Sequence, residues 1–494
     1  MEPTPTLARL CEAIFPQRSS DRSPGGELIR SSFSFLVACI VLLFGCSETA
    51  REEEQDGIDL PDTVTFAAHI APLLWENCMP CHRPGQAGPF SLITYQDARR
   101  KARTIRLVTG KRYMPPWPAD TSYSRFLGER VLSERQIALI AKWVDQGTLS
   151  GDTLTLPVPP AFSGTSLLGE PDAVVWLPDT FHVPGDGRDH FMIAKAPFEL
   201  ERDTFLRAIE FVPGNRRLVH HMNGAMVNYT DGAKRDVFAS QVSYVNAEIA
   251  SGPAAFKTLA LENDDGSWPA LVPSAVNYLP GMAPVLPPAG IGGLFVKKKG
   301  AFLLNSLHYG PSSRDTMDRS RFNLWFASQP PSRPLQEISM GSNHTPIEPP
   351  LHLGPGEVRT FGTSYTLTQD ISVLTLNPHM HLLGKKFVAF AIAPSGDTIP
   401  LVRINDWDFR WQYTYTFPKL LPLTKGTVVH VTGTFDNTAA NPSQPFDPPR
   451  DVTGTDSRFM RTTDEMFQFF ITYIDHRPGD EHISSPLITE PTPS

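Results

Sequence analysis

The residue pattern with the most defined chemistry is Cys78-Met79-Pro80-Cys81-His82. A CxxCH sequence attaches haem through two thioethers and supplies its histidine to the iron, whereas CxxC alone also occurs in redox and zinc sites. A zinc site would need a second cysteine pair, and none follows in the sequence. The pattern therefore predicts haem c bound at Cys78, Cys81 and His82.

Met114 is the expected second iron ligand, because it lies in the proline-rich run RYMPPWPAD after the motif. Met79, inside the attachment motif, is poorly placed to reach the iron. Apolar residues at helical spacing precede the motif, and Ser133 with Gln136 gives a capping-box signature after it. This order of elements resembles the class I cytochrome c fold, in which a His/Met haem transfers electrons and has no open coordination position.

A second pattern is the pair His379 and His381, which flank Met380 in a predicted strand. Alternate residues of a strand face the same side, so both imidazoles can chelate one metal while Met380 and Leu382 face the core. Two exposed surface histidines are the alternative. Met466 begins the run MFQFFITYI and lies on the less apolar face of its predicted strand, which favours a ligand role over core packing.

A third pattern comprises His220, His221 and the more distant His308. Adjacent residues of a strand point to opposite faces, so His220 and His221 can share one metal only at a strand end or a β-bulge. His308 is expected on the same face as Phe302 and Leu304, where a packed core histidine is the alternative to a ligand.

Together the six residues resemble the copper type II, ascorbate-dependent monooxygenases, which include peptidylglycine α-hydroxylating and dopamine β-monooxygenases. Members of that family bind one copper through a His-His pair and a later histidine before Tyr-Gly. They bind a second copper through an HxH pair and a methionine. This methionine is preceded by two acidic residues, an Asp or Glu followed by a Glu. All six ligands occur here in the family's order. The resemblance implies one copper at His220, His221 and His308, and a second at His379, His381 and Met466.

The donor types agree with this assignment independently. Two imidazoles with a thioether favour copper over magnesium, calcium or non-haem iron, and zinc rarely takes methionine. The resemblance further implies two jelly-roll sandwiches that face each other across a solvent cleft. It also implies hydroxylation of a small substrate with O₂ at the catalytic His379, His381 and Met466. The second electron would come from the other copper. That copper would be reduced by an ascorbate-like reductant or a redox protein, or through the fused haem.

Two positions depart from the peptide-amidating members of the family. Asn377 and Phe470 stand where those enzymes have an Arg and a Tyr that anchor a peptide carboxylate, and this half of the chain has no cysteine for their disulfides. Peptide amidation is therefore not expected, and the sequence does not identify the substrate. The alternative is a non-catalytic electron-transfer lipoprotein whose sandwich binds copper or a partner.

Composition limits the remaining classes. Of 494 residues, 44 are Lys or Arg and 52 are Asp or Glu, and this net charge of −8 argues against a nucleic-acid partner. The 48 prolines favour β-structure and loops over helices. Five cysteines in this length exclude a disulfide scaffold.

The N-terminal region predicts export. Residues 33–45, FSFLVACIVLLFG, form an apolar run that suits a signal peptide and is too short to span a bilayer. The run ends at Leu43-Phe44-Gly45-Cys46, which resembles a bacterial lipobox and predicts a lipid on Cys46. We expect a membrane anchor and a periplasmic location, with the outer membrane preferred over the inner.

The sequence thus predicts a multidomain chain, a small all-α cytochrome c domain followed by two all-β jelly-roll sandwich domains. The expected segments are a signal peptide (1–45), an acidic tether (46–62), the cytochrome c domain (63–152), a linker (153–170), the first copper-binding sandwich (171–345), the second (346–484) and a tail (485–494).

Overall fold

The computed structural model describes residues 58–160, 166–250, 252–454 and 461–488. The chain divides into two compact units, Met1–Gly57 and Ile58–Ser494. The predicted signal peptide, Cys46 and most of the acidic tether therefore lie outside the described residues. Within those residues, no helix is both long enough and apolar enough to cross a membrane.

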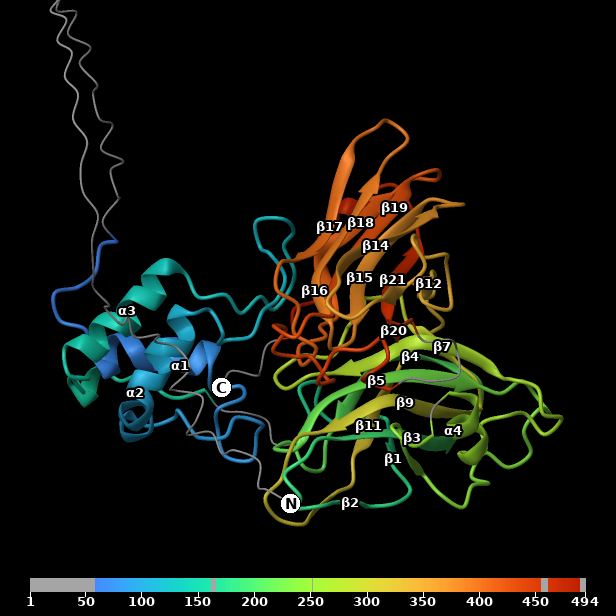
Figure 1. The fold of residues 1–494 in the computed structure, drawn as a ribbon, viewed down its shortest axis with the longest axis horizontal. Coiled ribbons are helices and arrows are strands. Elements are labelled where there is room, and N and C mark those ends of the chain that lie inside the picture. Colours follow the sequence, from blue (N-terminus) through green and yellow to red (C-terminus); the bar gives the residue numbers. More distant parts are fainter. Residues whose placement is uncertain (1–57, 161–165, 251, 455–460, 489–494) are drawn as a thin grey trace, which may run out of the picture. The chain divides into compact units, whose positions relative to one another are not determined.

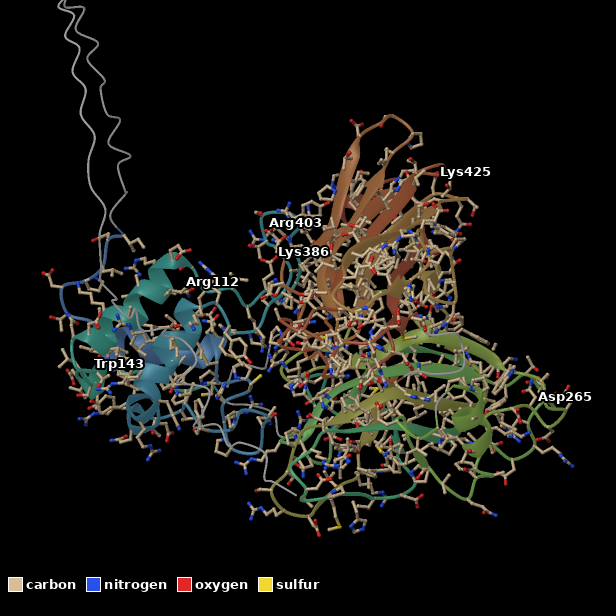
Figure 2. All side chains as sticks on the ribbon, in the orientation of Figure 1. Arg112, Trp143, Asp265, Lys386, Arg403 and Lys425 are labelled. Atoms are coloured by element: carbon tan, nitrogen blue, oxygen red, sulfur yellow. The ribbon has the colours of Figure 1, made fainter. Side chains whose placement is uncertain are left out.

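The first part of the described chain is helical. It contains the π-helix η2 (Phe66–Ile70), α1 (Ala71–Asn77), α2 (Tyr95–Gly110), α3 (Glu134–Asp145) and the short 3-10 helix η3 (Thr153–Thr155). A core that includes Ile70, Leu74, Ile140 and Trp143 joins η2, α1, α2 and α3 (Figure 2). The capping box predicted for the last helix is present at Ser133.

Helix α2 was not among the predicted elements. Four arginines and a lysine in YQDARRKARTIRLVTG dilute its apolar pattern, so that only Ala98, Ala102, Ile105 and Thr109 are buried. The missed signal was local. Thr94 and Asp97 form a reciprocal capping box at its N-terminus.

The next part consists of two antiparallel sheets that share one core (Figure 1). The first sheet has the order β1 (Ala173–Trp176), β11 (Arg321–Phe326), β4 (Thr204–Val212) and β8 (Leu294–Val296). The second has the order β6 (Tyr244–Asn246), β3 (His190–Glu199), β9 (Lys299–Tyr309), β5 (Val219–Asn228) and β7 (Ala270–Tyr278). The short strands β2 (Phe181–Val183) and β10 (Thr316–Asp318) pair beside them, and α4 spans Pro253–Thr258.

A second pair of antiparallel sheets follows, again around one core. One sheet has the order β12 (Gln336–Gly341), β21 (Phe467–Asp475), β15 (Ile371–Met380) and β18 (Tyr415–Leu423). The other has the order β14 (Val358–Thr366), β19 (Val428–Asp436), β16 (Gly384–Ile392) and β17 (Thr398–Ile404). The small pair β13 (His352–Leu353) and β20 (Val452–Thr453) and the 3-10 helix η4 (Asp480–His482) complete it.

The described chain is therefore mainly β-structure in several sheets, as the proline content predicted. One boundary differs from the expected one at 345/346. Strand β12 pairs with β21 through six residues, so the chain already belongs to the second pair of sheets at Gln336. Residues 347–350, IEPP, follow β12 and form a loop inside the second pair.

The loop between α2 and α3 extends from the helical part to the second pair of sheets. Ala119 forms a bridge with Ile404 of β17, and Asp120 Oδ2 lies 2.8 Å from Arg403 Nη2 (Figure 2). Arg130 Nη2 donates to the carbonyl of Gly281, in the connection after β7. This loop carries Met114, so these contacts bring the expected haem region to the sheets.

Candidate metal centres

His220, His221 and His308 lie together, with candidate ligand atoms all within 4.8 Å of one another. A β-bulge makes this possible on β5, where Val219 pairs with Tyr309 and His221 with His308, so that His220 is the extra residue. The sequence predicted such a bulge or a strand end as the condition for a shared site. The bulge turns two adjacent imidazoles toward one place.

His308 does not lie on the face that the sequence predicted. Strand β9 has its own bulge, because Ser306 pairs with Asn223 and Leu304 with Gly224, which leaves Asn305 as an extra residue. The alternation therefore shifts by one after Leu304. Leu307 and Tyr309 enter the core with Phe302 and Leu304, while His308 turns to the opposite face, toward β5.

Hydrogen bonds hold several ring nitrogens of this cluster. The Nε2–H of His308 donates to Asp189 Oδ1 at 2.7 Å, and its Nδ1 lies 3.4 Å from Nδ1 of His221. His221 Nε2 is hydrogen-bonded with Ser306 Oγ. His220 Nδ1 is buried and has no hydrogen-bond partner among the described residues. Burial lowers the pKa of His220 to about 4, so this imidazole is neutral at pH 7.

His379 and His381 also meet, with ring centroids 5.1 Å apart and planes at 90°. Each ring donates its Nδ1–H to an oxygen, His379 to Gln412 Oε1 at 2.6 Å and His381 to the Asp464 carbonyl at 2.7 Å. Both Nε2 atoms are therefore unprotonated. Burial lowers the pKa of His379 to about 4 and that of His381 to about 3, which keeps both rings in the ligating form.

Met466 is buried immediately before β21, the strand that pairs with β15. His379 pairs with Gln468, and Met466 lies two residues before Gln468. The opposite face of β21, with Phe467, Phe469, Ile471 and Tyr473, enters the core as predicted. By strand alternation Met466 is expected on the face of Gln468 and His379, although it lies just before the strand itself.

The end of β15 differs from the expected pattern in one detail. Leu382 is half-buried, and Leu383 takes the core position instead. The strand ends at Met380 and the chain then turns, which resets the alternation. The buried carboxylate of Glu465 holds this turn by accepting the backbone N–H groups of His381 and Leu383 at 3.1 and 2.7 Å.

The connection between β17 and β18, residues 405–414, lies between the two histidine clusters. The Phe409 ring is 5.4 Å from that of His221 and 5.7 Å from that of His381, and only 7% of Phe409 is exposed. Gln412 Oε1 accepts hydrogen bonds from both Asn223 and His379. Side chains of this connection therefore occupy space between the two histidine clusters.

The residues expected to attach haem occupy a half-buried position after α1. Cys78 and Cys81 are free thiols. The Nδ1–H of His82 donates to the Phe90 carbonyl at 3.1 Å, so Nε2 is the nitrogen left for a metal. A Cβ added to Gly88 would lie 2.8 Å from the His82 ring, so this glycine lets the following loop pack on the imidazole. Met79 is buried in the helical core, as its place in the motif suggested.

Met114 is partly buried at the start of the Met-Pro-Pro-Trp run that leads to the second pair of sheets. Several residues that contact the candidate ligands were not among the predicted site residues, including Asp189, Phe409, Gln412 and Glu465. Among these, only Glu465 had a usable signal, because it directly precedes Met466. The others come from distant parts of the chain and have no local motif.

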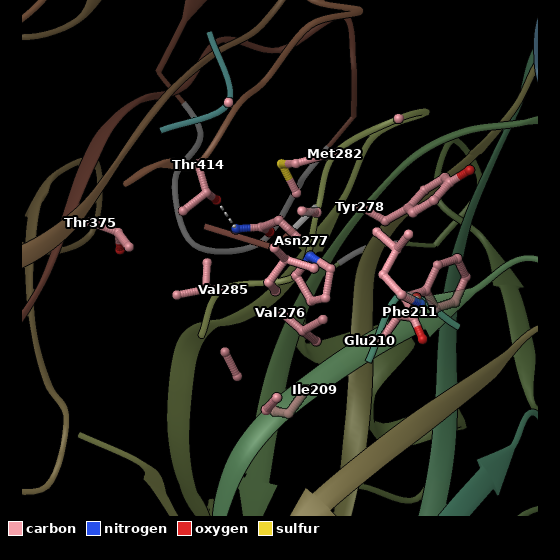
Figure 3. A pocket seen from close by; sticks show the side chains of 18 of the residues that line it. Ile209, Glu210, Phe211, Val276, Asn277, Tyr278, Met282, Val285, Thr375 and Thr414 are labelled. Atoms are coloured by element: carbon pink, nitrogen blue, oxygen red, sulfur yellow. Dashed lines mark hydrogen bonds between the residues drawn. The ribbon is translucent and has the colours of Figure 1, made fainter. Parts of the chain in front are cut away.

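A cavity of about 800 Å³ opens between the helical part and both pairs of sheets (Figure 3). Apolar side chains such as Val276 and Val285 and polar ones such as Glu337, Thr375 and Thr414 line it. None of the ten candidate haem and copper ligands is among its lining residues. Asn377, two residues before His379, hydrogen-bonds to the Tyr413 carbonyl at the sheet face between Thr375 and the histidines.

Comparisons with known proteins do not assign the chain to a family. No protein-family model matches it, and no curated protein matches it. Among solved structures, it is similar to the structures of infectious bursal disease virus strains Gx and Gt. The identities are 10% and 9%, over 63% of this chain and 74% and 72% of the viral chains. The TM-score is 0.16 in both cases, which carries no argument about function.

Proposed function

We propose that this protein is a copper-dependent monooxygenase that hydroxylates a C–H bond of a small molecule with O₂. In this proposal the helical part is a class I cytochrome c domain, and the two pairs of sheets are jelly-roll sandwiches that each hold one copper. One observation carries the proposal. Two histidine clusters, one from each pair of sheets, flank Phe409, and in each cluster a protein partner orients an imidazole through one ring nitrogen.

The donor sets fit copper. Three imidazoles meet at the first cluster, where the buried Nδ1 of His220 lacks a protein partner among the described residues. A buried nitrogen without a hydrogen bond costs free energy, which a bound metal would remove. The second cluster adds a thioether, and such a soft donor beside imidazoles favours copper.

The CxxCH region fits haem c. Both thiols are unpaired, and His82 is oriented through Nδ1 so that Nε2 is available to iron. A ring nitrogen tied to a backbone carbonyl is the usual way in which a protein orients a ligating histidine. We propose Met114 as the second axial ligand, which makes this domain an electron-transfer site.

Each group of this chain then has a defined task. Copper, when bound, would supply the reduction of O₂ and the hydroxylation of the substrate. Gln412 and the Asp464 carbonyl orient His379 and His381, and Glu465 fixes the turn that follows them. Asp189 orients His308. Phe409 excludes water from the space between the two clusters.

Export and lipid attachment at Cys46 complete the proposal. They rest on the apolar run before Cys46 and on the haem motif, because haem c is attached outside the cytoplasm in bacteria. An ascorbate-like reductant or a redox protein would deliver electrons to the haem.

The test is the ratio of copper to haem iron in the full chain, produced in a host that attaches haem c and loaded with Cu(II). We expect two coppers per haem, and one in each of the variants His221→Ala and His381→Ala. His352→Ala, an exposed histidine, should retain two. A wild-type ratio near zero would contradict the proposal and favour the non-catalytic electron-transfer reading.

A further inference from the structure

Three aromatic rings connect the first histidine cluster with the helical part. The Trp411 ring lies 5.6 Å from that of His220, and Tyr413 lies 6.5 Å from Trp411 with an interplanar angle of 23°. The Trp117 ring follows, 5.2 Å from Tyr413. Trp411 and Tyr413 belong to the 405–414 connection, whereas Trp117 belongs to the loop between α2 and α3. The rings therefore form one unbroken series of contacts between two parts of the fold.

The outer end of this series lies at the expected haem site. Trp117 follows Met114 by three residues, and the Tyr413 hydroxyl donates to the carbonyl of Pro116 in the same run. Cys81 lies beside the same loop, because its Sγ is 2.8 Å from where a Cβ of Gly281 would lie, and the Gly281 carbonyl accepts from Arg130. Met114 and Cys81, both proposed to bind haem, thus lie in or beside the loop that carries Trp117.

We propose that Trp117, Tyr413 and Trp411 form the path by which one electron passes from the haem domain to the metal held by His220, His221 and His308. The inference rests on the proposed function. Its balance is simple, because ferrous haem is oxidised to ferric haem and Cu(II) is reduced to Cu(I). No bond forms or breaks, and no proton is transferred.

The surroundings of the rings indicate how they act. The Tyr413 hydroxyl donates to a backbone carbonyl, and Trp117 Nε1 is buried without a hydrogen-bond partner among the described residues. Neither ring has a base that could take its proton, so neither is suited to form a neutral radical. The rings serve instead as a packed bridge for direct transfer, with Tyr413 buried and both tryptophans partly buried against the same core. Ring contact is then the important property, and the Tyr413 hydroxyl is dispensable.

The contacts also indicate the order of the sites. Phe409 touches His221 of the first cluster and His381 of the second, and its other ring contact within the described chain is with Phe191 of β3. Among the described residues, the ring series that starts at Trp117 meets the histidine clusters at His220. Electrons from the haem domain therefore arrive first at the His220 cluster, which agrees with an electron-storing role for that copper.

The test uses the full chain with haem and both coppers bound, under anaerobic conditions. A flash-activated flavin reductant reduces the haem, and the return of ferric haem absorbance reports transfer to Cu(II). We expect Trp411→Leu to slow this return at least tenfold, Trp411→Phe to slow it less, and Tyr413→Phe to leave it near the wild-type rate. Trp407→Phe, a buried tryptophan of the same connection outside the ring series, is the control.

Copper content and the Cu(II) EPR spectrum of each variant are measured first, so that a lost metal is not mistaken for a lost path. An unchanged rate in Trp411→Leu with both coppers present would overturn the path while leaving the proposed function intact. Wild-type protein that binds copper but shows no haem reoxidation would overturn both the path and the haem as electron source. Wild-type protein that binds no copper would overturn the path and the proposed enzyme together.

Discussion

Gln412 Oε1 accepts a hydrogen bond from the Nδ1–H of His379 at 2.6 Å. The same oxygen accepts from Asn223 Nδ2 at 3.0 Å, and the Gln412 amide donates to the Phe409 carbonyl. Gln412 is almost fully buried. One side chain from a loop therefore orients a candidate copper ligand of the second cluster and contacts β5, the strand that carries His220 and His221.

Replacing Gln412 with Leu should weaken copper binding at the second cluster alone. Loss of such an outer partner of a ligating histidine typically costs about 10–100-fold in metal affinity. Copper titration followed by EPR would measure both sites. Asn223→Ala, which removes the other hydrogen bond to Gln412, should have a smaller effect. Equal affinities in wild type and Gln412→Leu would show that His379 needs no such orientation.

Replacing Met466 with Ala should abolish copper-dependent O₂ uptake while leaving the haem spectrum intact. The thioether is the soft donor that favours Cu(I), the state that reacts with O₂. Uptake with ascorbate as reductant and visible absorbance are the two measurements. Met340→Leu, a buried methionine of β12 in the core, is the matched control. Undiminished uptake in Met466→Ala would remove Met466 from the proposed site.

Replacing Gly88 with Ala should disturb the haem. The new Cβ would lie 2.8 Å from the His82 ring and 2.7 Å from the Cys81 carbonyl, so the imidazole or the loop must move. We expect an altered haem absorbance spectrum and a shifted reduction potential. Gly110→Ala, where a Cβ meets nothing within 4 Å, should leave both unchanged. Identical haem spectra for the two variants would show that the loop around Gly88 moves and the His82 imidazole does not.

Replacing Asp480 with Asn should destabilise the second pair of sheets. The Asp480 carboxylate accepts from Arg333 and Ser372 at 2.6 Å, and removal of one partner of a buried ion pair costs about 3–5 kcal/mol. Burial opposes ionisation of Asp480, but these partners lower its pKa to about 2. Its contribution is therefore complete above the ordinary value of 3.8 and is lost as the pH falls through 2.

Chemical denaturation of Asp480→Asn at pH 7 measures this loss. Asp451→Asn, which removes an exposed partner of His352, provides the comparison and should change the free energy of unfolding by less than about 1 kcal/mol. Similar stability of the two variants would mean that Arg333 finds another partner.

The contribution of Glu337 to stability is expected to depend on pH with the opposite sign. Burial raises its pKa from 4.5 to about 7, although Ser339 and the Ser274 N–H partly oppose the shift. The folded chain then binds more protons at this site than the unfolded chain, so its contribution is present below pH 4.5 and is lost as the pH rises through 7. Glu337→Gln should therefore gain stability relative to wild type between pH 4.5 and 8. If the free energies of unfolding of wild type and Glu337→Gln differed by the same amount at every pH in this range, the raised pKa of Glu337 would be contradicted.

Residue types and local spacing by themselves determined a large share of the candidate sites. The CxxCH run, the HxH pair and the two faces of the strand after Met466 were legible because haem attachment and strand alternation depend on neighbours in sequence. The buried face of Phe467, Phe469, Ile471 and Tyr473 is as predicted. The proline content correctly indicated a chain dominated by sheets and loops.

Only the tertiary structure decided how the sites are assembled. Each bulge, at His220 and at Asn305, shifts a strand by one residue, and such an insertion leaves no signature in an alternating pattern. The position of Trp411 and Gln412 depends on packing between segments separated by nearly 300 residues, from Trp117 to Tyr413. Local sequence specifies which side chains can bind metal, whereas burial and long-range packing determine which of them meet.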